Sequence, residues 1–143
     1  MKWVALMRSR SAANLALVVL IAALQSCTIV PTGPLGPGEL RMLKMEPPKT
    51  IRAGSPYEVV LTFEADGTPE ITRACFLWSW EAQREGPYCF PVYDVKPGHP
   101  GTLKVSLYTR YPRVYTLDGY AEYQRGEKLK KSNEVSVQIW IER

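Results

Sequence analysis

The sequence predicts an all-β protein, a single antiparallel β-sandwich of about seven strands. Three observations predict this fold class. β-Branched and aromatic residues alternate with polar residues over short runs, Gly, Pro and Asp separate these runs, and no amphipathic helical period follows residue 27. Short alternating strands at turn spacings of about ten residues are typical of two antiparallel sheets packed face to face.

The first three expected strands are 40–45, 57–64 and 71–80. The first is a short run that contains Leu40 and Met45, and the third is rich in aromatic residues. The second shows the period of two most clearly and ends at the turn 65–67. Its apolar positions are Tyr57, Val59, Leu61 and Phe63.

The other four expected strands are 88–95, 103–107, 115–123 and 135–141. In the last two, one face is apolar and is expected to face the core. The apolar residues of these faces are Tyr115, Leu117, Ala121, Tyr123, Val135, Val137, Ile139 and Ile141. All seven strands fall within residues 39–143, which have the length of one ordinary domain.

Three segments resemble immunoglobulin-like and fibronectin-like domains of bacterial surface proteins. Residues 48–59 are similar to their first-strand exit and second strand, 95–98 to the turn before their fifth strand, and 115–137 to their last hairpin. The resemblance implies an immunoglobulin-like sandwich in which the third, sixth and seventh strands share a sheet. Such a fold hosts many activities and implies no function.

Cys75 and Cys89 lie on the third and fourth expected strands, which a hairpin connects, so we expect them to form a disulfide. Two free buried thiols are the alternative. A zinc site is not expected, since two cysteines and the one histidine, His99, cannot fill four ligand positions without carboxylates. We expect no metal and no other cofactor.

No catalytic constellation is evident, and we expect a protein that is not an enzyme. His99 lies between Pro97-Gly98 and Pro100-Gly101, the composition of a surface turn. Nucleophile elbows, phosphate loops and zinc-protease motifs are missing from the sequence. Converging carboxylates stay open as an alternative, and the candidates are Glu81, Glu85, Asp94 and Asp118.

Aromatic residues supply the candidate binding surface. Since alternate neighbours face the core, Tyr120 and Trp140 are expected to point outward from adjacent strands and to form a flat platform. Such a platform stacks on sugar rings or anchors a protein partner, although a cross-strand pair that only stiffens the sheet is the alternative. Phe76 and Trp78 are expected in the core. Trp80, Tyr88 and Phe90 could extend the platform or fill the core.

Residues 1–26 have the pattern of an export signal. Basic residues in 1–10 precede an uncharged stretch, 11–26, that is short for a membrane span. Leu24, Ser26 and Cys27 match the box of bacterial lipoprotein signal peptides, with Gln25 departing from it. The resemblance implies cleavage before Cys27 and lipidation of its sulfur, which also leaves an even pair of cysteines. A plain secretory signal is the alternative.

Residues 27–38 are expected to be a tether, because Pro and Gly dominate the segment and favour extended, loosely jointed chain. In lipoproteins of enteric-type bacteria, an Asp after the lipidated cysteine resembles an inner-membrane retention signal. Thr28 stands there, which implies the outer membrane in an organism that has one.

The charge does not indicate a nucleic-acid binder. Three of the 18 Lys and Arg residues precede Cys27, so the chain after it has a formal net charge of +1. The remaining basic cluster, Lys128, Lys130 and Lys131, is expected in a hairpin turn, with contact to anionic lipid as the alternative. We therefore expect an anchored envelope module that binds proteins or has a structural role, and a glycan- or peptidoglycan-binding module as the alternative.

Overall fold

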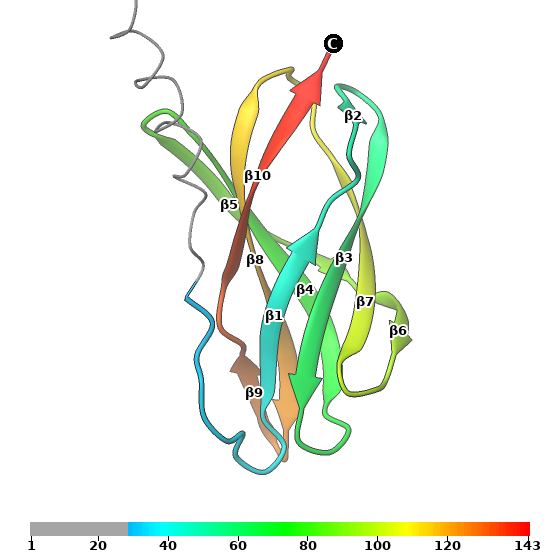
Figure 1. Ribbon diagram of the computed structural model, residues 1–143, viewed down its shortest axis with the longest axis vertical. Coiled ribbons are helices and arrows are strands. Elements are labelled where there is room, and N and C mark those ends of the chain that lie inside the picture. The colour runs from blue at the N-terminus through cyan, green and yellow to red at the C-terminus, as the bar shows by residue number, and fades with distance from the viewer. Residues whose placement is uncertain (1–28) are drawn as a thin grey trace, which may run out of the picture.

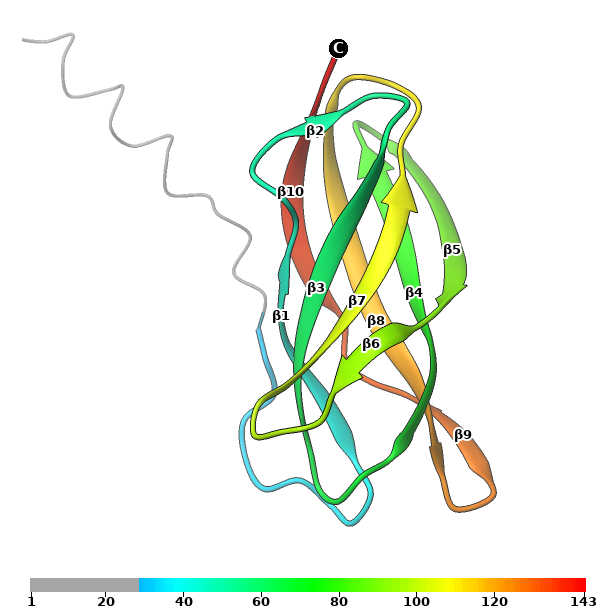
Figure 2. The same cartoon turned by 90° about the vertical axis from the view of Figure 1, so that its right-hand side faces the viewer.

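The protein is all-β, and its two sheets pack face to face as a sandwich (Figures 1 and 2). The structure, a computed structural model, describes residues 29–143. The predicted signal residues and Cys27 lie outside this range. No helix that could span a membrane occurs within it.

Ten strands form the two sheets. The first sheet has the order β1-β3-β7-β6, and the second has the order β2-β10-β8-β4-β5, with β9 paired to β8. The strands are β1 (Leu40–Glu46), β2 (Ile51–Arg52), β3 (Pro56–Ala65), β4 (Glu70–Trp80), β5 (Gln83–Pro91), β6 (Tyr93–Lys96), β7 (Gly101–Tyr108), β8 (Val114–Arg125), β9 (Lys128–Lys131) and β10 (Val135–Glu142).

The predicted sandwich is confirmed, and β4, β8 and β10 share a sheet as expected. Within residues 29–143 the structure has ten strands where about seven are predicted. The expected strand 88–95 is two strands, since the chain passes from the second sheet to the first between Pro91 and Tyr93. The structure adds the short strands β2 and β9, and β2 pairs with β10 in parallel, so the sandwich is not wholly antiparallel.

The alternating apolar faces meet between the sheets, as the period of two predicts. Phe76 and Trp78 belong to this core, as expected. Its largest fully buried side chains are Phe76, Met42, Leu61, Leu103, Leu107, Leu117, Ile141, Val59, Val105 and Val135.

Tyr115 marks the corner between β7 and β8. Its hydroxyl donates a hydrogen bond to the carbonyl of Tyr111, four residues upstream, at 3.2 Å. A tyrosine near the start of the corresponding strand, bonded back to the chain before it, is a feature of immunoglobulin-like sandwiches. This bond fixes the connection that precedes β8.

The last part of the predicted tether lies against the domain. Glu39 accepts a hydrogen bond from the N–H of Gly36 at 2.7 Å and forms an ion pair with Arg125 at 3.2 Å. Arg41 donates to the carbonyl of Gly33 at 2.9 Å. The segment 33–39 therefore turns along the domain near the β8–β9 hairpin, in contrast to the loose extension that its composition predicts (Figure 1).

Candidate functional site

The predicted aromatic platform of Tyr120 and Trp140 does not form. Trp140 is 72% exposed, whereas Tyr120 is only 6% exposed. Trp140 lies opposite Val114, six residues along β8 from Tyr120, which corresponds to about 20 Å along a strand. The two rings therefore cannot act as one surface.

Tyr120 does point away from the main core, as alternation predicts, but other side chains cover it. It packs with Cys75 and Leu77 in a small separate cluster. The ammonium group of Lys131 lies 3.9 Å from the centre of its ring, a cation–π contact. Lys131 reaches this ring because β9 pairs with β8. In the sequence, β9 is recognisable only as a basic cluster expected in a turn.

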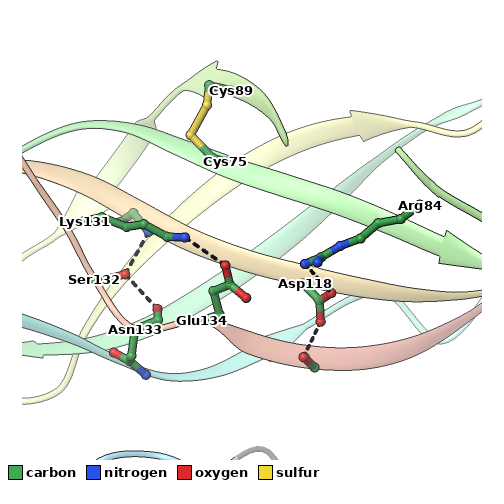
Figure 3. Close-up of polar contacts among 10 residues, drawn as sticks. Cys75, Arg84, Cys89, Asp118, Lys131, Ser132, Asn133 and Glu134 are labelled. Atoms are coloured by element: carbon green, nitrogen blue, oxygen red, sulfur yellow. Dashed lines mark hydrogen bonds and ion pairs between the residues drawn. A yellow bond between two sulfur atoms is a disulfide. The ribbon is translucent and has the colours of Figure 1, made fainter. Parts of the chain in front are cut away.

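Figure 3 shows how polar bonds close this outer face. Lys131 pairs with Glu134 at 2.8 Å, and the N–H of Ala121 donates to the hydroxyl of Ser132 at 2.9 Å. Arg84 on β5 reaches Asp118 on β8 at 3.5 Å. The outer face of the second sheet is thus occupied by its own side chains around Tyr120.

The predicted disulfide between Cys75 and Cys89 is present, and the two residues lie opposite each other on β4 and β5 (Figure 3). Glu122 lies beside them, and the three side chains could approach one metal ion. In the disulfide, however, the two sulfurs bond to each other and offer no thiolates. The disulfide therefore links the edge strand β5 covalently to β4.

A pocket of about 830 Å³ lies between the β4–β5 hairpin and the β7–β8 connection. This volume is within the range of ligand pockets in proteins. Seven aromatic rings line it together with four charged side chains and two uncharged polar ones. The lining residues are Trp78, Trp80, Glu81, Gln83, Glu85, Tyr88, Phe90, Tyr108, Thr109, Arg110, Tyr111, Arg113 and Tyr115.

The pocket exists because one strand of the first sheet is short. Strand β6 pairs with β7 only between Tyr93 and Lys104 and between Lys96 and Thr102. Beside the later half of β7, the first sheet therefore has no further strand within residues 29–143. Strands β4 and β5 of the second sheet continue there, so their aromatic inner face is left uncovered. Three of the rings that this leaves beside the pocket are more than half exposed, namely Tyr88, Tyr108 and Tyr111.

A bulge in β5 shapes one wall. Phe76 pairs with Tyr88 and Trp78 with Glu85, so two residues of β5, Gly86 and Pro87, lie opposite the single residue Leu77 of β4. Gly86 has a φ of 110°, and a Cβ atom there would lie 2.6 Å from the carbonyl oxygen of Phe76. Only glycine fits this position. The bulge brings both Glu85 and Tyr88 to the pocket.

A pair of rings and two guanidinium groups form the other wall. Trp80 and Tyr115 meet edge to face, with centroids 5.5 Å apart. The guanidinium of Arg113 lies 5.5 Å from the Trp80 centroid, and that of Arg110 lies 5.6 Å from the Tyr111 centroid. Burial raises the pKa of Tyr115, and the charge of Arg113 opposes this effect. The tyrosine therefore stays a neutral hydroxyl at neutral pH.

The structure brings only some of the predicted carboxylates together. Glu81 and Glu85 line the same pocket. Asp94 pairs with Lys104 at 3.4 Å on the other sheet, and Asp118 pairs with Arg84 on the outer face. His99 lies exposed in the β6–β7 connection. The prediction that the protein is not an enzyme stays a prediction.

The β7–β8 side of the pocket is not among the features that the sequence predicts. The segment 108–115 contains three tyrosines and two arginines, the residue types that dominate binding hot spots. This density of Tyr and Arg is the signal that could have identified the site. Trp80, Tyr88 and Phe90, expected either in the platform or in the core, all line the pocket, and Trp80 and Phe90 also pack against the core.

The fold and this pocket define a single β-sandwich domain with an aromatic recess at one open edge. No protein-family model and no curated protein matches the sequence.

Proposed function

We propose that the protein is an exported, lipid-anchored module of the cell envelope that binds a partner protein through the aromatic pocket. The observation that carries the binding role is the pocket's composition. Tyr, Trp and Arg are the residues most enriched in the energetic centres of protein interfaces. Here Tyr88, Tyr108 and Tyr111 are exposed around one recess, with Arg110 and Arg113 beside them.

The anchor rests on the sequence. The box formed by Leu24, Ser26 and Cys27 follows an uncharged stretch too short for an ordinary membrane span. The proposal includes the outer membrane in an organism that has one, because Thr28 replaces the Asp of the retention signal. Mass spectrometry of the mature amino terminus tests it. We expect a diacyl or triacyl adduct on Cys27, and an unmodified thiol or cleavage elsewhere would contradict it.

Affinity purification from solubilised envelopes tests the binding role. We expect an envelope protein to co-purify with the wild-type chain and to be lost from the Tyr88→Ala, Tyr108→Ala double variant. Both side chains are about half exposed, so their removal should leave the fold intact. Trp140→Ala is the matched control, since Trp140 is an exposed aromatic residue outside the pocket. Equal recovery with all three proteins would contradict the proposal.

Glycan binding is the second candidate function. Because Tyr120 is covered, the proposed glycan site is the pocket and no longer the platform of Tyr120 and Trp140. The exposed tyrosine rings offer faces for sugar stacking, and Gln83 and Glu85 beside them offer hydrogen bonds to hydroxyl groups. Retention on purified peptidoglycan or cell polysaccharide, abolished in the same double variant, would favour this function over protein binding.

A further inference from the structure

We propose that the partner binds as an extended peptide segment that adds a strand to the later half of β7 and places an apolar side chain in the pocket. This inference rests on the proposed protein-binding function and specifies how that binding occurs. The added strand would continue in the position that β6 leaves empty. It would complete the first sheet opposite the exposed aromatic face of β4 and β5.

Within the described residues, the later half of β7 has backbone N–H and C=O groups that are free to pair with another strand. Among the strands of residues 29–143, none pairs with β7 after Lys104 on the side away from β3. The carbonyl of Thr109 points toward β3, where it accepts a hydrogen bond from Gly54 at 2.9 Å. Since backbone groups along a strand alternate between its two sides, the N–H and C=O groups of Ser106 and Tyr108 face the open side. An unpaired edge of this kind is a template for another strand.

The pocket provides the specificity that edge pairing lacks. In strand addition, main-chain bonds supply affinity and pockets select alternate side chains. A strand beside Ser106 and Tyr108 would direct every second side chain between the sheets, where the rings of Trp78 and Phe90 line the recess. The expected segment therefore alternates apolar and polar residues.

Charge indicates one further property of the segment. Among the described residues, Arg110 and Arg113 contact aromatic rings and form no ion pair with a carboxylate. Both lie just beyond the end of β7. A strand antiparallel to β7, as β6 is, would begin at this end, so an acidic residue is expected on the amino-terminal side of its apolar residues. The segment 28–38 of a second copy has no acidic residue and matches poorly.

Peptide selection on the full-length protein provides the test. A displayed library of random nonapeptides is selected against the protein, and the most enriched sequence is synthesised as the probe. We expect alternating apolar residues preceded by Asp or Glu. On addition of this probe, the backbone amides of Ser106 and Tyr108 should exchange with solvent more slowly.

Two variants separate main-chain pairing from side-chain contact. Ser106→Pro removes the N–H that faces the open edge, and proline is tolerated on edge strands. We expect this variant to bind the probe about tenfold more weakly. It loses one backbone hydrogen bond to the peptide, and the proline ring displaces the adjacent backbone groups. Ser106→Ala, which keeps the N–H, should bind as the wild type does. If Ser106→Pro does not fold, the amide exchange of the wild-type protein decides.

Other outcomes overturn the inference in distinguishable ways. A probe that needs Tyr88 and Tyr108 but leaves the Ser106 amide unprotected would exclude strand addition and keep the pocket as the binding site. If no peptide is enriched, the inference fails, and the proposed function then depends on the affinity purification alone. Protection of the Ser106 amide that rises with protein concentration, without peptide, would assign the edge to a second copy.

Discussion

At the scale of single residues, Asn133 shows how one side chain can join two sheets. Its amide oxygen accepts the N–H of Met42 at 2.8 Å, and its amide nitrogen donates to the carbonyl of Met42 at 2.9 Å. Met42 lies where the register of β1 and β3 shifts, and it is fully buried. The side chain of Asn133 thus serves both backbone groups of Met42 at this irregularity.

Replacing Asn133 with Ala should destabilise the protein by about 2 kcal/mol or more, because a buried donor and a buried acceptor would both lose their partner. The free energy of unfolding, measured by urea denaturation, tests this. Glu127→Ala, in the exposed β8–β9 turn, is the control and should change the stability by no more than about 0.5 kcal/mol. Equal stability of the two variants would show that water replaces the amide.

At the scale of elements, the disulfide holds the strand that carries one wall of the pocket. Strand β5 is an edge strand, and its bulge interrupts its pairing with β4. Cys89 lies between Tyr88 and Phe90, which both line the pocket. The covalent bond to Cys75 therefore fixes the strand where its side chains are needed.

The Cys75→Ala, Cys89→Ala double variant should lose about 3 kcal/mol of stability, the effect of opening a loop in which 14 positions separate the cysteines. Denaturation in urea measures the loss. Amide exchange should also accelerate in β5 more than in β3, which lies inside the other sheet. A uniform change over both strands would contradict a local role of the disulfide.

At the scale of the whole molecule, the junction between the chain's entry and the domain is a folded structure. Glu39→Ala removes the carboxylate that accepts the Gly36 N–H, so the Gly36 amide should exchange about fivefold faster. Hydrogen exchange followed by NMR measures this. Glu46→Ala, which removes an exposed carboxylate at the end of β1, is the control and should leave the exchange of the Gly36 amide unchanged. No effect of Glu39→Ala would indicate that the segment is held by other contacts.

The sequence predicted the sandwich well because each strand carries its own period of two. The inward face of β8, with Leu117 and Ala121, could be assigned from neighbours along the chain alone. Alternation does not tell which sheet a strand joins, so the passage from β5 to β6 after Pro91 was read as one strand.

The binding site was harder to predict because it depends on what lies opposite a residue. Tyr120 does face outward, but Lys131, eleven residues later, covers it. The pocket forms because β6 is short. The residues near Trp80 and Tyr88 in the sequence do not indicate that, in the described part of the chain, the first sheet has no strand opposite these two side chains. Likewise, the composition of the tether gave no sign that Glu39 would hold Gly36.

The docked segment 33–39 and the aromatic recess lie on different sides of the domain. The recess borders β5, an edge strand of the second sheet. The chain enters beside β1, which lies on the other side of the domain from β5 (Figure 2). The docked segment also lies near the β8–β9 end, where Glu39 pairs with Arg125, and the β7–β8 connection lies at the other end of the domain (Figure 1). The recess therefore opens on the side of the domain away from the docked segment, and a molecule that approaches from that side meets the open edge of β7 first.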